Sequence, residues 1–317
     1  MQVINITVQA LAALLGLGLI GFIIVKRKIL PESVLSVLTP LVIDIALPCM
    51  VFVSIVKKFD PAVNPDWWAL PLWWMLFTAG LAVMTVVFGW IASADIRKEF
   101  RMSLFYQNGL FVPTGLIMGL FGRDTGLLAD LFLFMILYPA FFFNTYHLFF
   151  MKRDRNGIAV AWNRVFNPVL AATMAALTVR LCGVQDFIPG FVVQIMAQVG
   201  DITIPLIMII LGGSIYIDFR KRGEPRWAEI VKFVAIKNLA FPAVTLMILY
   251  LFRPSFNIAI LMLIQSAVPP VTSVPSMIER VKGNAGAVNQ FLLYSFIASV
   301  VTIPAALMVF HLIYPIY

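Results

Sequence analysis

The sequence predicts an all-α polytopic membrane protein, and three properties of the chain lead to this prediction. Hydrophobic residues make up 62% of the 317 residues and charged residues only 12%, and the mean hydropathy is +0.97. A soluble core cannot cover that much apolar surface, so lipid is the expected solvent. The apolar runs are roughly 20 residues long, the length of a membrane-spanning helix. Because hydrocarbon offers free backbone groups no partner, helices are expected rather than a barrel of short strands.

Dividing the first half of the chain at Pro, Gly and charge clusters gives five spanning segments. The first, 5–25, follows no basic region and precedes no cleavage site, so it is interpreted as a spanning helix and not as a signal peptide. KRK ends it, and KK ends the second, 35–56. The third is 68–92. The fourth, 102–121, is interrupted within LFYQNGLFVPTGLIMGLF, and the fifth, 127–150, ends at MKRDRNG.

The second half divides in the same way into five further segments. They are 162–182, 188–216, 228–251, 257–279 and 286–314. The fourth of this half is interrupted within ILMLIQSAVPPVTSVPSMI, which holds three prolines and several small polar residues. The sequence thus predicts ten transmembrane helices, of which the fourth and the ninth are broken.

The basic residues predict the orientation of these helices. The net charge of +8 comes from basic residues in the connections between the predicted helices. These residues are explained by membrane topology, so nucleic-acid binding is not expected. The positive-inside rule places the more basic loops in the cytoplasm and therefore both termini on the outer side, in a plasma membrane. Connections of odd number carry Lys26, Arg27, Lys28, Arg97, Lys98, Arg101, Lys152, Arg153, Arg155, Arg164, Arg220, Lys221, Arg222, Arg226, Arg280 and Lys282, and those of even number only Lys57, Lys58, Arg123, Arg180 and Arg253.

Marker residues recur at an offset of 157 positions and indicate an internal duplication. LVIDIALPCMVFVSI in segment two corresponds to QVGDITIPLIMIILGGSI in segment seven, and the same shift carries Pro113 onto Pro270. Each half has an odd number of helices, so the second half enters the membrane from the opposite side. We therefore expect an inverted repeat, with residues 1–150 and 162–317 as the two halves and 151–161 as a cytoplasmic linker. In this arrangement the two breaks meet near the membrane midplane.

The breaks supply the candidate binding residues. Proline frees backbone carbonyls and amides that lipid cannot satisfy, and half-helix N-termini suit a carboxylate. Paired proline kinks that only pack against neighbouring helices are the alternative interpretation. The candidates for substrate binding are Asn108, Gly109, Pro113, Thr114, Gly115, Gln265, Pro269, Pro270, Thr272 and Ser273.

Three ionisable residues inside apolar segments are candidates for charge or ion coupling. Lys237 lies deep in segment eight, where a charge costs about 3 kcal/mol, so it needs a partner. It either neutralises carbonyl ends of the broken helices, forms a salt bridge with Asp44 or Asp201, or attracts an anion. Asp44 and Asp201 each precede a proline by four residues. Each either binds a coupling H⁺ or Na⁺ or caps backbone groups at the kink.

Several chemistries lack their motifs in this sequence. It contains no GxxxxGK[ST] loop, no HExxH and no cysteine cluster, and Cys49 and Cys182 are both expected in packing roles. Ser266, Ser273 and Ser276 have no well-placed His, which disfavours a serine hydrolase. We therefore expect no enzyme, no metal site and no cofactor beyond a possible coupling ion.

The chain resembles the auxin efflux carrier family, which includes plant auxin exporters and bacterial malate and malonate carriers. The resemblance spans the whole length and rests on KRKILPES, the segment from Asn108 to LFG, Gly200-Asp201 with Pro205 and LGGS, Lys237 five residues before Pro242, and AVPPVTSVPSMIERVKG. The chain departs from its relatives at Pro113, where they usually have Gly, at Gly115, where they have Pro, and at Ser273, where bacterial members often have Asn.

This resemblance implies a fold similar to that of bile-acid symporters and Na⁺/H⁺ antiporters. Helices four and nine would cross at their breaks, helices 1, 2, 6 and 7 would form a scaffold, and helices 3–5 and 8–10 a transport domain. It also implies a small organic anion as substrate and a homodimer formed through the scaffold helices.

The leading functional hypothesis is a secondary transporter that moves a small carboxylate, such as malate, malonate or an auxin-like acid, by alternating access. A Na⁺/H⁺ antiporter using Asp44 and Asp201 is the first alternative, although the adjacent acidic pair expected at the breaks is absent. The second is a membrane sensor that binds a ligand without transporting it.

Overall fold

The structure is a computed structural model that describes residues 2–122, 125–150 and 167–315. These residues form helices and one isolated bridge but no strand. The predicted linker 151–161 lies outside the described residues. The all-helical part of the prediction is confirmed.

Helices in the first half follow the predicted segments, but several segments consist of more than one element. Segment two is a continuous run of an α-helix, a π-helix and an α-helix. Segments four and five are each divided. The elements are α1 (Gln2–Lys26), α2 (Ser33–Pro40), the π-helix η1 (Leu41–Ala46), α3 (Leu47–Lys58), α4 (Ala69–Phe88), α5 (Arg97–Phe105), α6 (Phe111–Phe121), α7 (Leu127–Phe134), α8 (Tyr138–Thr145) and the 3₁₀ turn η2 (Tyr146–Phe149).

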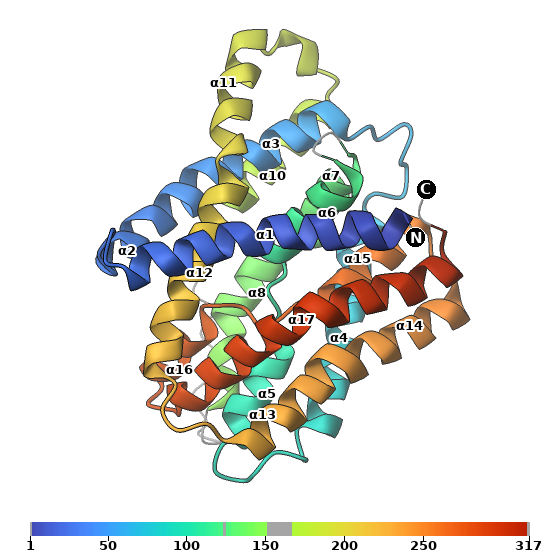
Figure 1. The fold of residues 1–317 in the computed structure, drawn as a ribbon. Helices are drawn as coiled ribbons and strands as arrows, with labels where there is room; N and C mark the ends of the chain where they lie inside the picture. The colour runs from blue at the N-terminus through green and yellow to red at the C-terminus, as the bar shows by residue number, and fades with distance from the viewer. Residues whose placement is uncertain (1, 123–124, 151–166, 316–317) are drawn as a thin grey trace, which may run out of the picture.

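The second half ends in the longest helix of the described chain. It comprises α10 (Pro168–Leu181), the 3₁₀ turn η3 (Gln185–Phe187), α11 (Gly190–Asp201), α12 (Thr203–Lys221), α13 (Trp227–Val234), the π-helix η4 (Ala235–Ala240), α14 (Phe241–Phe252), α15 (Phe256–Ala267), α16 (Val274–Arg280) and α17 (Ala285–Ile313). The N- and C-terminal ends of the chain lie toward the same end of the molecule (Figure 1).

Five helical stretches of the described chain are long and apolar enough to cross a membrane. Five shorter apolar helices accompany them, and each predicted segment contains one of the ten. The long stretches are Ser33–Lys58, Ala69–Phe88, Gly190–Lys221, Trp227–Phe252 and Ala285–Ile313, and the shorter ones are Ala12–Lys26, Phe111–Phe121, Leu127–Phe142, Pro168–Leu181 and Phe256–Ala267.

Two π-helical turns lie where the sequence predicts simple proline kinks. η1 ends one residue before Leu47-Pro48, and η4 ends one residue before Phe241-Pro242. Proline cannot donate to the carbonyl four residues earlier and its ring collides with that carbonyl. A π-turn widens the helix by one residue and relieves this conflict. Each π-turn contains one of the intramembrane charges, Asp44 in η1 and Lys237 in η4.

Glycines bring α1 and α12 into direct backbone contact. A Cβ atom on Gly212 would fall on the carbonyl oxygen of Gly18, and one on Gly21 would fall on that of Ile209. Small residues allow this approach, which lets van der Waals packing and weak backbone contacts hold membrane helices together. The two helices cross toward the C-terminal end of α1 (Figure 1). They therefore form a closely packed pair.

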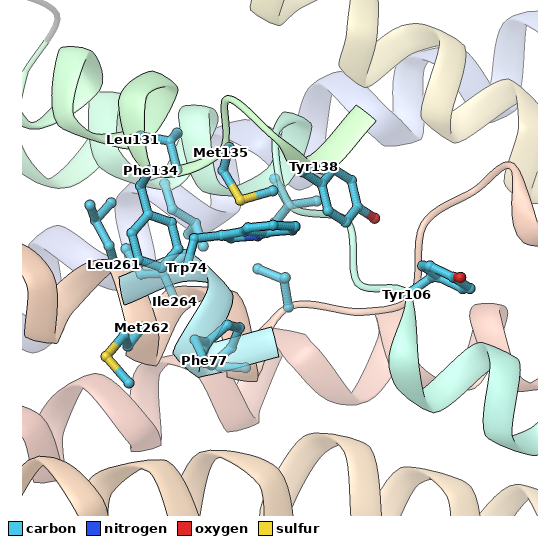
Figure 2. Packing of buried hydrophobic residues seen from close by; sticks show 14 of the residues in the cluster. Trp74, Phe77, Tyr106, Leu131, Phe134, Met135, Tyr138, Leu261, Met262 and Ile264 are labelled. Atoms are coloured by element: carbon cyan, nitrogen blue, oxygen red, sulfur yellow. The ribbon is translucent and has the colours of Figure 1, made fainter. Parts of the chain in front are cut away.

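An aromatic cluster lies between α4, α7 and α8. Trp74 of α4 lies edge-on to Tyr138, with ring centroids 6.4 Å apart, and to Phe141 at 5.5 Å. Figure 2 shows Trp74 among Phe134, Met135 and Tyr138, with side chains of α15 close by. Rigid aromatic packing of this kind fixes α4, α7 and α15 relative to one another.

Ion pairs connect the loops at the predicted cytoplasmic end. Arg220 at the end of α12 donates to Glu32 at 2.6 Å, and Arg226 before α13 donates to Asp95 at 2.5 Å. The hydrogen bond from the Arg226 guanidinium is the main cause that lowers the pKa of the Asp95 carboxyl. Between these pairs, the side-chain amide of Gln290 donates to the carbonyls of Arg222 and Glu224. The α12–α13 loop is thereby attached to α17.

Candidate functional site

The two interruptions lie side by side and are joined by main-chain hydrogen bonds. One is residues 106–110, between α5 and α6, and the other is residues 268–273, between α15 and α16. Asn108 N donates to Pro269 O at 2.9 Å, Val271 N donates to Tyr106 O at 3.0 Å, and Gln107 and Pro270 form an antiparallel bridge. We call these two stretches the paired breaks. Their pairing satisfies backbone groups that lipid could not.

Asn108 begins the second half of the first interrupted helix. Its side-chain oxygen accepts from the backbone N–H of Phe111 at 3.2 Å and of Val112 at 3.4 Å, the first two residues of α6. Asn108 therefore caps α6 from two residues before the N-cap position, which is taken by Leu110 without a side-chain hydrogen bond, and it serves N–H groups that have no partner within the helix. The residue is 1% exposed, and its Nδ2 has no hydrogen-bond partner among the described residues.

Gln265 reaches the paired breaks from the end of α15. Its Nε2 donates to the carbonyl of Gly109 at 2.7 Å. Its Oε1 has no partner among the described residues, although the side chain is 0% exposed. A Cβ atom on Gly109 would lie 3.0 Å from this Oε1 and would collide with the methyl group of Met135. Glycine is therefore required for the close packing of Gln265 and Met135 over the break.

The prolines of the two breaks occupy different positions. Pro269 and Pro270 lie in the extended stretch itself, whereas Pro113 lies in the first turn of α6. Pro113 thus follows the interruption directly, at a position where its missing N–H would have had no helical partner. In the helix that follows the second break, α16, the proline of the first turn is Pro275.

The small residues after Asn108 serve packing and backbone contacts. The Thr114 hydroxyl donates to the carbonyl of Leu110 at 2.5 Å, within its own helix. Gly115 faces Leu14 of α1, whose side chain a Cβ would meet at 2.6 Å. Thr114 and Gly115 thus join α6 to its own first turn and to α1.

Thr272 and Ser273 end the second of the paired breaks, and Thr272 faces α12. Thr272 and Phe111 line a small cavity of about 30 Å³ together with residues of α2, η1 and α12. Ser273 takes the N-cap position of α16, but its side chain makes no capping hydrogen bond. The cavity is the size of one water molecule, so the paired breaks pack closely against η1 and α12.

Lys237 lies against the C-terminal end of α15. Its ammonium donates to Ser266 O at 3.3 Å and lies 5.3 Å from the centre of the Phe241 ring, and the residue is 0% exposed. Helix C-termini carry partial negative charge and unpaired carbonyls. The described contacts of Lys237 are therefore those expected of a charge that stabilises the first half of the broken helix.

The two aspartates lie away from the buried interior. Asp44 is exposed on η1, and Asp201 is exposed at the end of α11. Neither faces the buried core that holds Lys237 and Gln265. The salt bridge considered between Lys237 and either aspartate is not among the described contacts of Lys237.

Sequence reasoning missed several residues that hold the paired breaks. The Tyr138 hydroxyl donates to Gln107 O at 2.5 Å, and the Tyr106 hydroxyl lies 2.7 Å from that of Thr145. Asn238, the neighbour of Lys237, exchanges hydrogen bonds with Ser295 of α17. Tyr106 and Asn238 could have been found from their places in the first break and beside Lys237, whereas no signal in the sequence marks Tyr138.

An apolar cavity of about 800 Å³ adjoins the paired breaks. It lies between α1, α12 and α17 and includes Val112, whose N–H is capped by Asn108. Other lining residues are Leu15, Leu19, Met208, Leu211, Leu293, Phe296 and Val300. α17 also packs directly against α1 and α12 beside this cavity.

Comparison with known proteins identifies the family. A family model described as membrane transport protein matches residues 6–307, almost the whole chain. This is the family of auxin efflux carriers that the sequence motifs indicate, so that prediction is confirmed. No curated protein sequence matches the chain.

Proposed function

Because the chain belongs to this family of membrane transport proteins, we propose that it is a secondary transporter of small organic anions whose binding site is formed by the paired breaks. The observation that carries the proposal is the buried N-terminus of α6, which is capped by Asn108 and leaves Asn108 Nδ2 without a partner among the described residues. The N–H groups of this first turn are already bonded or, at Pro113, absent, so the donor left for a carboxylate is Asn108 Nδ2, at the end of the helix where the dipole is positive. Family membership indicates transport rather than catalysis.

The proposed mechanism is alternating access around the paired breaks. In it, the two halves of the chain form inverted repeats, and helices 4 and 9 cross at the breaks. α1, α2, α3, α10, α11 and α12 form the scaffold, and the remaining helices form the transport domain. Two contacts support this division: the glycine-mediated contact of α1 with α12, and the packing of α3 against α10 and α11.

Coupling and assembly complete the proposal. Asp44 and Asp201 are exposed on helices assigned to the scaffold. An intramembrane carboxylate on a surface, such as Asp44, needs a partner or a proton, so we assign Asp44 either to H⁺ or Na⁺ coupling or to the interface of a homodimer formed through the scaffold. Asp201, its counterpart 157 residues later in the repeat, is assigned to the same alternatives on that correspondence alone. Lys237 contributes a positive charge near the site through the end of α15.

Flux measurements on two matched variants test the binding site. We expect Asn108→Ala to lower carboxylate flux into proteoliposomes at least tenfold, because it removes the donor and the helix cap. Loss of an N-cap costs about 1 kcal/mol of stability, so the control is Asn167→Ala. Asn167 is the N-cap residue of α10 and, like Asn108, accepts from a first-turn N–H through its side-chain oxygen, here Leu170 N at 2.9 Å.

The control variant should lose similar stability in a thermal-unfolding measurement and retain its flux. Normal flux in Asn108→Ala would exclude the proposed site. Imposing a pH or Na⁺ gradient on the same proteoliposomes identifies the coupling ion.

A further inference from the structure

The orientations of the two side-chain amides at the paired breaks are fixed by backbone hydrogen bonds. Asn108 must present its oxygen to Phe111 N and Val112 N, which leaves Nδ2 for another partner. Gln265 must present Nε2 to Gly109 O, because two oxygens would repel each other there, and this leaves Oε1. Neither amide can be flipped without breaking these bonds.

The two remaining atoms are opposite in kind. Asn108 Nδ2 is a donor and Gln265 Oε1 is an acceptor, and neither has a partner among the described residues although both side chains are buried. They flank the same residue, Gly109, since Asn108 precedes it and Gln265 Oε1 would lie 3.0 Å from its Cβ. A buried unpaired polar atom is costly, and one in a binding site indicates what the ligand supplies.

A simple carboxylate can satisfy only one of the two atoms. Ionised carboxylate oxygens accept hydrogen bonds and have none to donate, so they suit Asn108 Nδ2 but not Gln265 Oε1. A ligand that carries a hydroxyl group next to its carboxylate supplies both an acceptor and a donor. Sites built to hydrogen-bond a substrate hydroxyl reject analogues that lack it, because the protein atom is then left buried and unpaired.

We propose that the paired breaks select hydroxycarboxylates over the corresponding carboxylates without a hydroxyl, and that Gln265 Oε1 accepts the hydrogen bond from the ligand hydroxyl. This inference rests on the proposed function, because it assigns a substrate class to the same site. It makes Gln265 the residue that determines specificity, while Asn108 binds the carboxylate common to both classes of ligand.

Three pairs of acids that differ by one hydroxyl test the inference without any mutation. They are lactate and propionate, malate and succinate, and phenyllactate and phenylpropionate, which differ in size and charge but share the test group. Binding to purified protein is measured by thermal shift, and flux by competition in proteoliposomes, at about pH 7.5, where the carboxyls are ionised. For the pair whose size fits the site, we expect the hydroxy acid to bind about tenfold or more tightly, the effect of one hydrogen bond to a buried acceptor.

Two variants then assign the preference to Gln265. Gln265→Met removes the acceptor with little change in volume, and Gly109→Ala places a methyl group beside Oε1 while leaving Gln265 in the chain. Both should reduce the ratio of the two affinities to about one. Because the ratio is formed within each variant, a lower yield of folded protein does not affect it. Asn108→Ala should weaken both acids of a pair by the same factor and leave the ratio unchanged.

Each outcome distinguishes this inference from the proposed function. Anion transport without a hydroxyl preference would leave the proposed function intact and overturn the inference, as would a preference that persists in Gln265→Met. The absence of binding and flux for all six acids would count against both. A preference that both variants abolish would establish Gln265 as the residue that recognises the hydroxyl.

Discussion

Asparagine and glutamine side chains at the paired breaks are oriented by the backbone around them. Asn108 caps α6, and Gln265 holds the carbonyl of Gly109. Sequence alone indicates that polar residues near a broken helix face the break. It cannot indicate which end of the Gln265 amide is already used, because that depends on Gly109, a partner 156 residues away in the chain.

At the residue scale, Lys237 tests whether a buried charge supports the fold or acts in transport. Replacing it with Met removes the donor to Ser266 O and leaves carbonyls at the end of α15 without a partner. We expect a loss of about 1–3 kcal/mol in stability, the cost of an unsatisfied buried acceptor. Thermal unfolding in detergent measures this.

The control for Lys237 is Lys57→Met at an exposed position of α3, which should change stability by less than about 0.5 kcal/mol. An unchanged melting temperature in Lys237→Met together with lost flux would instead assign Lys237 to substrate or proton movement.

At the element scale, prolines predict where helices are disturbed but not in what form. Pro48 and Pro242 each follow a π-turn, Pro113 fits the first turn of α6, and Pro270 lies in extended chain. The same residue type produces these outcomes because its cost depends on whether the missing N–H would have had a partner. The positions of the ten apolar segments could be predicted, since they depend on composition and length.

The close contact between α1 and α12 depends on glycine. We expect Gly212→Val to separate α1 from α12, because its side chain would fall on the carbonyl of Gly18. The loss of stability should be about 2 kcal/mol or more, at the upper range for overpacking. Differential scanning fluorimetry of the purified variant measures it.

Gly80→Val is the matched control for this substitution, since nothing lies within 4 Å of a Cβ at Gly80 of α4. Equal stability of the two variants would show that α1 and α12 can move apart without cost and would remove one support for a rigid scaffold.

At the scale of the whole molecule, three helices line an apolar cavity of about 800 Å³. α1 and α12 are in backbone contact, and α17 packs against both beside the cavity. Sequence predicts the helices but not this cavity, because the apolar residues that line it have the same composition as those that face lipid. The loop after α12 is held to α17 by the side-chain amide of Gln290.

The orientation of the whole molecule in the membrane can be tested with single cysteines. In a variant lacking Cys49 and Cys182, we expect a membrane-impermeant maleimide to label Asn64→Cys on intact cells. Glu224→Cys should be labelled only after permeabilisation, because its loop is among the basic ones. The reverse pattern would place both termini in the cytoplasm.

The paired breaks are held to one another by main-chain hydrogen bonds, and such bonds are indifferent to side-chain identity. Substitutions at Pro113, Gly115 and Ser273, the positions where this chain departs from its relatives, therefore leave the connection between the two breaks in place. The architecture of the site and the chemistry it recognises can thus change independently over evolution. A carrier built in this way can acquire a new substrate by altering a few side chains around a permanent backbone frame.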